Sequence, residues 1–263
     1  MPTPDQAPSA PTADPWLGLR RFTAARIALG RAGGSQRTET VLNFRLAHAS
    51  ARDAVHATFD PSSLAAQLSA AQLTVEQLAT AVTNRRDYLL RPDLGRRLDE
   101  ASRLKLRSLA NAQKNAPPDL VIIVSDGLAA QAAERHAADT IRPLVAALRA
   151  EAWLIAPIII APLARVKVQD EIGAALGARF SLILIGERPG LGAPDSLGAY
   201  FTSAPAANRT DADRNCVSNI RPEGIHPAQA AAKLAWLLLE SARTGRAGVH
   251  LKDTQPTASA ELR

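Results

Sequence analysis

A change of hydrophobic period near residue 117 is the feature that most constrains the fold of this chain. Before it, apolar residues recur about one helical turn apart, whereas Leu120–Ser125 is a continuous and mostly β-branched run. An apolar run without alternation is typical of a strand that is covered on both faces. Pro117 and Pro118 separate the two patterns, and two adjacent prolines exclude both a helix and a sheet ladder there. The sequence therefore predicts a boundary at this point.

Beyond this boundary, strand-like runs alternate with helix-like runs. After Leu120–Ser125, the predicted strands are Leu154–Ile160 and Phe180–Ile185, and the predicted helices cover residues 128–138, 143–150, 168–176 and 226–243. Such alternation favours a doubly wound, mostly parallel sheet. We therefore expect an α/β fold in which a helical N-terminal region precedes a Rossmann-like sheet domain.

The sequence divides into four expected regions. Residues 1–15 and 254–263 lack core-forming patterns and are expected to be a flexible extension and a flexible tail. Residues 16–116 are the expected helical region, and residues 117–253 the expected sheet domain. Gly30–Gly34 is interpreted as the cap and turn that end a first helix. Helical patterns in this region cover residues 16–29, 38–59, 64–73, 75–90 and 98–114.

Composition and charge are those of an ordinary globular chain. Of the 263 residues, 46% are hydrophobic and 21% charged, which excludes wholesale disorder. Lys and Arg number 31 against 25 Asp and Glu, and the net charge of +6 favours phosphate-bearing or polyanionic partners in general. A single cysteine allows no internal disulfide and favours a reducing, intracellular compartment. The apolar runs fall short of the roughly 20 residues that cross a bilayer, and no secretory signal is present, so no membrane contact is expected.

The edge of the sheet where parallel strands end is the best candidate site on physical grounds. Ligands of open α/β sheets bind beyond the carboxyl ends of the strands. Three segments follow predicted strands directly: residues 125–127, 161–166 and 186–190. Neither the Gly-x-Gly-x-x-Gly dinucleotide pattern nor a P-loop occurs in them. We expect the three segments to converge on a site of another kind.

Two side chains are candidates for chemistry, each with an alternative interpretation. Cys216 is a candidate nucleophile whose pKa Arg214 would lower, or a buried structural thiol. Glu187 is a candidate acid, base or ligand anchor, or the partner of an ion pair with Arg188 or Arg165. The sequence shows no acid–base pair or nucleophilic constellation, so no catalytic residue is assigned.

Metal and nucleic-acid sites find little support in the sequence. His48 and His56 share about one face of a predicted helix, but no third ligand joins them, so no metal site is expected. The basic residues of 85–107 are interleaved with carboxylates, which is typical of a solvated or protein-binding face. Without aromatic interleaving or a known module, nucleic-acid binding is not expected.

Nine longer motifs occur in one order along the chain. They are Leu19–Gly34, Leu46–His56, Tyr88–Leu98, Ser125–Leu128, Asp170–Gly173, Leu184–Leu191, Asp195–Tyr200, Arg209–Gly224 and Leu251–Asp253. Together they resemble the small (light) subunit of ethanolamine ammonia-lyase, from about Trp16 to Asp253. So many long motifs in one order make the resemblance highly specific.

The resemblance implies an adenosylcobalamin-dependent lyase that converts ethanolamine into acetaldehyde and ammonia by a radical mechanism. It implies a large-subunit partner that holds the substrate and most of the radical chemistry, with six copies of each chain in the complex. The small subunit would complete the cobalamin site at the interface and be inactive alone. The implied location is cytoplasmic, either free or inside a bacterial microcompartment.

The resemblance also places cobalamin contacts at Val166, Glu187 and Cys216, and Arg165 and Arg188 are added here as their neighbours. Val166 and Glu187 fall in strand-end segments that were selected above on physical grounds. The alternative function is a free-standing α/β binding module for a phosphate-bearing small ligand. Copurification with a barrel-forming partner, and cobalamin binding only to the pair, would separate the two functions.

Overall fold

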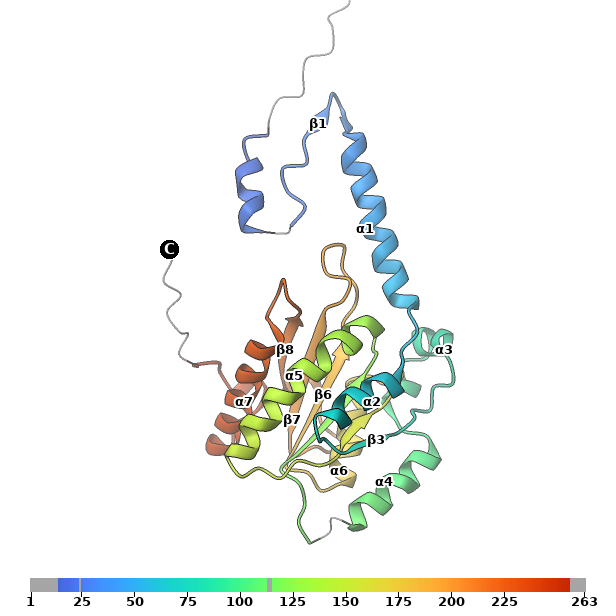
Figure 1. The fold of residues 1–263 in the computed structure, drawn as a ribbon, viewed down its shortest axis with the longest axis vertical. Helices are drawn as coiled ribbons and strands as arrows, with labels where there is room; N and C mark the ends of the chain where they lie inside the picture. The colour runs from blue at the N-terminus through green and yellow to red at the C-terminus, as the bar shows by residue number, and fades with distance from the viewer. Residues whose placement is uncertain (1–13, 24, 113–114, 256–263) are drawn as a thin grey trace, which may run out of the picture.

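A six-stranded sheet forms the centre of the computed structural model, which describes residues 14–23, 25–112 and 115–255 (Figure 1). The strand order is β3-β5-β4-β6-β7-β8, in which β3, β5, β4 and β6 are parallel while β7 and β8 are antiparallel to their neighbours. The strands are β3 Val75–Gln77, β4 Leu120–Ser125, β5 Ile158–Ile160, β6 Phe180–Gly186, β7 Leu197–Ser203 and β8 Arg214–Ile220. The expected α/β fold with a mostly parallel sheet is confirmed.

Helices cover both faces of this sheet. Ile122 of β4 belongs to a core with Leu64, Leu144 and Leu234, whereas the neighbouring Ile123 belongs to a second core on the opposite face. The first face carries α2 Pro61–Ala70, α5 Ala130–Ala150 and α7 Pro227–Thr244, and the second carries α4 Glu100–Ala112 and α6 Val168–Ala175. The short elements are α3 Arg85–Leu90, η2 Leu94–Arg96, η3 Asp211–Asp213 and η4 Gly248–His250. Among the described residues, no helix is both long and apolar enough to cross a membrane.

The predicted strands at the centre of the sheet are present, and every residue of β4, β5 and β6 is buried. The helix predictions beyond residue 117 differ from the structure at one place. The predicted helices 128–138 and 143–150 are one helix, α5, that continues through Pro143. Ile141, Leu144 and Leu148 are buried on both sides of the proline, and this packing outweighs the one hydrogen bond that a proline removes.

Three strands of the six-stranded sheet lie outside the sequence prediction: β3, β7 and β8. The edge strand β8 buries only Arg214, Val217 and Ile220 and has a mostly polar sequence, so it offers no apolar run. At the other edge, β3 has three residues, none of them fully buried. The expected helix over residues 75–90 is therefore wrong except for α3, and the sheet takes a strand from before residue 117.

The first predicted helix, over residues 16–29, is also wrong. The chain forms a 3-10 turn, η1 Leu17–Phe22, and then an extended segment that leads into a hairpin of β1 Arg31–Ala32 and β2 Ser35–Gln36. Gly33 has φ +60° at the tip of this hairpin, so the expected glycine turn is present but ends no helix. The next helix, α1 Thr38–His56, is confirmed.

An arm therefore precedes the sheet, and we use this name for residues 14–23 and 25–56. Figure 1 shows α1 projecting from the body of the molecule, with η1 and the hairpin near its far end. The expected helical region 16–116 is accordingly only partly helical. The expected extension 1–15 and tail 254–263 lie mostly outside the described residues.

Candidate functional site

The three predicted strand-end segments converge at one edge of the sheet. Asp126 Oδ1 accepts a hydrogen bond of 2.6 Å from the Leu163 amide, and Ser125 Oγ accepts one of 3.0 Å from the Ala164 amide. The Leu128 amide donates to the Gly186 carbonyl at 2.9 Å. The turns after β4, β5 and β6 are therefore tied together, as the sequence predicted.

Asp126 is the centre of this junction. Burial raises the pKa of its carboxyl, although the hydrogen bond from Leu163 and the charge of Arg85 oppose that rise. Arg85 Nη1 lies 3.0 Å from Asp126 Oδ2 and also donates to the Gly127 carbonyl at 2.6 Å. Arg85 Nε donates to the Val55 carbonyl at 2.8 Å, so one guanidinium joins the end of α1 to the end of β4. Sequence reasoning missed this role, because the partners are 30 to 42 residues apart.

A cavity of about 660 Å³ opens beside this edge. Three of the predicted site residues, Arg165, Val166 and Cys216, line it, although the chain places Cys216 fifty residues after the other two. The remaining lining residues are Pro92, Arg96, Lys167, Tyr200, Arg209, Thr210, Asp211 and Arg214. The structure thus brings together residues that the sequence analysis selected by separate arguments.

Arg165 is held in one orientation by Tyr88. Its guanidinium carbon lies 3.9 Å from the centre of the Tyr88 ring, and Nη2 donates to the Tyr88 carbonyl at 2.7 Å. The buried Nε has no hydrogen-bond partner among the described residues. An oriented guanidinium without a carboxylate partner is suited to an anionic ligand.

Cys216 lies in β8, directly opposite Tyr200 of β7. Desolvation by the surrounding chain raises the pKa of the thiol to about 11, while a hydrogen bond with Tyr200 opposes the rise and the nearby Glu187 adds to it. Arg214, expected to lower this pKa, instead binds Asp170. The nucleophile interpretation is therefore wrong in its premise, since the thiol stays protonated at neutral pH. The buried-thiol alternative does not hold either, because the Cys216 side chain is exposed.

This raised pKa predicts slow modification of Cys216. At pH 8 a small thiolate-dependent reagent should react roughly a hundredfold more slowly with the folded chain than with the chain in urea, because the folded pKa lies about two units above the unfolded value. The rate should rise tenfold per pH unit up to about pH 11. Equal rates in the two states at pH 8 would contradict the raised pKa of the folded thiol.

A buried ion pair supports the wall of the cavity below Cys216. Arg214 donates from Nη1 to Asp170 Oδ1 at 2.9 Å and from Nη2 to Asp170 Oδ2 at 2.7 Å. Lys167 Nζ also binds Asp170 at 3.1 Å, and it donates to the carbonyls of Ala207 and Arg209. These bonds fix the loop before β8 against the start of α6.

Glu187 forms neither of the ion pairs considered for it. Within the described part of the chain, no ion pair joins it to Arg188 or Arg165. Its Oε2 accepts hydrogen bonds from the Ser196 hydroxyl and, at 3.2 Å, from the Asn219 amide. Oε1 accepts none from the described residues, and Glu187 is not among the residues that line the cavity. Arg188 is exposed and does not line the cavity.

The cavity carries an excess of positive charge. Of its five cationic lining residues, Lys167 and Arg214 share the buried Asp170, and Arg209 lies 3.6 Å from Asp213. Arg96 and Arg165 form no ion pair with a described carboxylate. The arrangement favours an anionic group at the Arg96–Arg165 side of the cavity. Within the described residues, no three His, Cys, Asp or Glu side chains are grouped so that they could hold a metal ion.

Comparison with known proteins decides the family. The family model of the ethanolamine ammonia-lyase light chain matches residues 13–252. The chain belongs to this family. It is 51% identical to the ethanolamine ammonia-lyase small subunit of Ralstonia nicotianae, over 95% of this chain and 92% of the relative. The small subunits of Azotobacter vinelandii and Pseudomonas putida are 50% and 48% identical, over 97% and 99% of this chain and 93% and 92% of those relatives.

Membership of this family confirms the interpretation of the chain as the small subunit of a lyase that acts on ethanolamine. A small subunit implies a large-subunit partner. The alternative of a free-standing binding module finds no support in these relatives.

Proposed function

We propose that the chain completes an adenosylcobalamin site at its interface with the large subunit. The observation that carries this proposal is the open, positively charged cavity between the segment that follows β5 and the strands β7 and β8, which Arg165, Val166 and Cys216 line. A corrinoid has peripheral amides and one phosphodiester, and the cavity offers partners for both. When bound, this cofactor supplies a radical through homolysis of its cobalt–carbon bond.

Each candidate residue has a role that its surroundings support. Arg165, fixed on Tyr88, and Arg96, which also lines the cavity, would bind the phosphodiester. Glu187 would accept a hydrogen bond from a cofactor amide through Oε1. Val166 provides apolar contact, and Cys216 a neutral thiol at the same wall. Arg188 stays a prediction from the sequence, because it neither lines the cavity nor pairs with Glu187.

The residues that line the cavity suggest which subunit binds the cofactor and which binds ethanolamine. Its lining residues hold and orient a ligand but include no acid–base pair in a position to move a proton, so we propose that ethanolamine binds mainly to the large subunit. The cavity is too small and too open to enclose a corrinoid, and the large subunit would cover the rest of the cofactor.

The proposal also includes six copies of each chain in the complex and a location in the cytoplasm, either free or inside a bacterial microcompartment. The Rossmann-like description is supported by the parallel strands β3 to β6 between two helical layers.

Reconstitution tests the proposed function directly. The chain should be coexpressed with a family large subunit, and acetaldehyde formation from ethanolamine measured with adenosylcobalamin. We expect activity and cofactor retention only from the pair. Turnover by this purified chain alone, or tight cobalamin binding without the large subunit, would overturn the proposal.

Glu187→Gln should weaken cobalamin binding to the pair by about ten- to a hundredfold while leaving the melting temperature nearly unchanged. A carboxylate accepts a hydrogen bond more strongly than an amide does, and a charge-assisted bond is worth about 1.5–3 kcal/mol. The glutamine oxygen can still accept from Ser196 and Asn219, which preserves the local structure.

Ser196→Ala is the matched control for this variant, because it removes a hydrogen bond to the same carboxylate but keeps the charge. It should lower stability by about 1 kcal/mol and leave the cofactor affinity unchanged. Cofactor titration and thermal melts measure both quantities. If Glu187→Gln instead lowers the melting temperature and leaves the cobalamin affinity unchanged, Glu187 is not part of the site.

A further inference from the structure

The arm concentrates exposed apolar side chains. Half of the large hydrophobic residues that the described chain exposes lie within the first 46 positions. They are Trp16, Leu17, Leu19, Phe22, Leu42, Phe44 and Leu46. A monomeric soluble protein rarely exposes a group of this size, and such a group marks a surface that another molecule covers.

The helix of the arm is apolar on two opposite sides. Leu42 and Leu46 are four residues apart and share one side, whereas Phe44 points about 200° away and stacks on His48 with ring centres 6.1 Å apart. Only Thr40 and Ala54 of the 19 residues of α1 are buried. A surface helix normally hides one apolar stripe against its own core, and a helix that is apolar on several sides is normally enclosed. The described part of this chain leaves much of α1 uncovered, which favours a surface that another chain covers.

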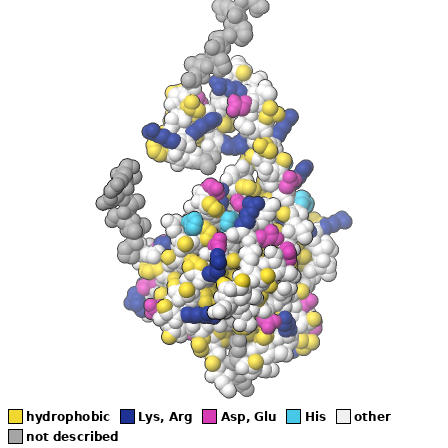
Figure 2. Space-filling view, viewed as in Figure 1, with side chains coloured by type: hydrophobic (Ala, Val, Ile, Leu, Met, Phe, Trp, Pro, Cys, Tyr) yellow, Lys and Arg dark blue, Asp and Glu magenta, His cyan; other side chains and the backbone are white. Residues whose placement is uncertain are grey.

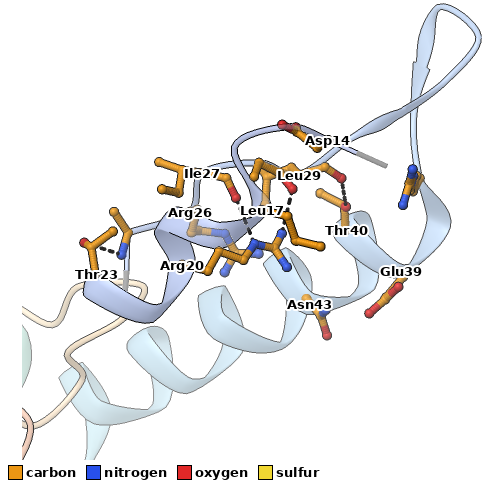
Figure 3. A pocket seen from close by; sticks show the side chains of 13 residues that line it. Asp14, Leu17, Arg20, Thr23, Arg26, Ile27, Leu29, Glu39, Thr40 and Asn43 are labelled. Carbon is orange, nitrogen blue, oxygen red and sulfur yellow. Dashed lines mark hydrogen bonds between the residues drawn. The ribbon is translucent and has the colours of Figure 1, made fainter. Parts of the chain in front are cut away.

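The arm is nevertheless pre-formed. Arg20 Nε and Nη2 donate to the carbonyls of Ile27 and Ala28 at 3.1 and 3.0 Å, and Thr40 Oγ1 donates to the Leu29 carbonyl at 3.2 Å (Figure 3). Figure 3 shows the extended segment lying along the first turns of α1, with Arg20 between them. A surface that is ordered before binding loses less conformational entropy when a partner arrives.

The arm projects from the same edge of the sheet as the candidate cofactor cavity. Its base is fixed there, because Arg85 joins the Val55 carbonyl of α1 to Asp126 and Gly127 at the end of β4. At about 1.5 Å per residue, α1 extends roughly 28 Å from that edge. A large subunit that covers the cavity would therefore meet the arm as well.

The charge of the arm indicates the chemistry of its partner. Residues 14–56 contain seven arginines against three carboxylates. Figure 2 shows dark-blue side chains beside yellow ones over this part of the molecule. Mixed arginine and apolar surface is the composition of the buried centre of protein interfaces, and it complements a partner surface that is apolar with acidic groups.

We propose that the arm is a clamp that docks onto the large subunit, with α1 lying in an apolar groove bordered by carboxylates. This inference rests on the proposed function, since it takes the large subunit as the occupant. It adds to that function a second contact, separate from the cofactor cavity, which holds the two chains together.

The test compares two matched double variants of the full chain in binding to a family large subunit without cofactor. Leu42→Ala/Leu46→Ala removes two exposed leucines of the arm, 56% and 68% exposed. Leu104→Ala/Leu154→Ala removes two leucines of similar exposure, 55% and 52%, from α4 and the opposite edge of the sheet. Alanine keeps the helix propensity of α1, so both variants should melt as the wild type does. Binding and sedimentation of the chain alone are measured for each.

We expect the arm variant to bind the large subunit at least thirtyfold more weakly and the control variant to bind unchanged. Phe44→Ala should weaken binding about tenfold from the other side of the helix, and Arg45→Glu should weaken it more at low than at high salt. The inference is overturned if both double variants bind the large subunit equally well. It is also overturned if the chain forms a dimer that Leu42→Ala/Leu46→Ala dissociates while binding to the large subunit stays unchanged. If the wild-type chain itself fails to bind a large subunit, the proposed function fails instead.

Discussion

Asp170→Asn is expected to lower the free energy of unfolding by about 3–5 kcal/mol. The side chains of Asp170 and Arg214 are 2% and 3% exposed, and two hydrogen bonds of 2.9 and 2.7 Å join them. Asparagine keeps the shape of aspartate but leaves the Arg214 guanidinium buried without its counter-charge. An arginine guanidinium keeps its proton in proteins, so Arg214 cannot become neutral to escape the penalty.

Urea unfolding of the chain alone measures this loss, and an exposed pair provides the control. Asp139 pairs with Arg142 on α5, where both side chains are about half exposed. Asp139→Asn should cost less than about 1 kcal/mol, as surface ion pairs do. Replacing both buried partners, with Asp170→Leu and Arg214→Met, should recover much of the stability that Asp170→Asn loses. A loss below about 1 kcal/mol for Asp170→Asn would contradict the role of this pair.

The centre of the fold could be predicted from sequence because burial there is complete. Strands β4, β5 and β6 lie between two helical layers, so nearly every position is apolar and the run is visible without alignment. The antiparallel strands β7 and β8 have mixed or polar sequences. β7 joins the sheet through its pairing with β6, and β8 through its pairing with β7, a non-local effect that no window of sequence contains.

The candidate site, like the fold, has parts that the sequence predicts and parts that it does not. Segments that directly follow strands are placed by the parallel topology, which is why residues 125–127, 161–166 and 186–190 were predicted to converge and do. The pair of Asp170 and Arg214 was missed because its partners are 44 residues apart and each looks like an ordinary surface charge. The raised pKa of Cys216 was missed for the same reason: desolvation by distant parts of the chain raises it, and Arg214 binds Asp170 rather than the thiol near it in sequence.

Gly186→Ala is expected to lower stability by about 3 kcal/mol and to disturb the cofactor site as well. Gly186 ends β6 where the turn after β4 crosses it. A Cβ there would lie 2.2 Å from the Ala129 carbonyl oxygen and 2.3 Å from that of Asp126, and both are backbone atoms that no rotamer change can move. The opposing Gly127 has φ +52°, and its own Cβ would lie 2.3 Å from the Gly186 carbonyl oxygen, so neither side can yield.

The methyl group must therefore separate the ends of β4 and β6, and Glu187, the next residue, would move with β6. Gly190→Ala is the control in the same loop, because a Cβ there meets no heavy atom closer than 3.9 Å. It should stay within about 0.5 kcal/mol of the wild type. Urea unfolding of the chain alone and cobalamin titration of the pair measure the two effects. If Gly186→Ala is as stable as Gly190→Ala, the close contact between the strand ends is not what holds the candidate site together.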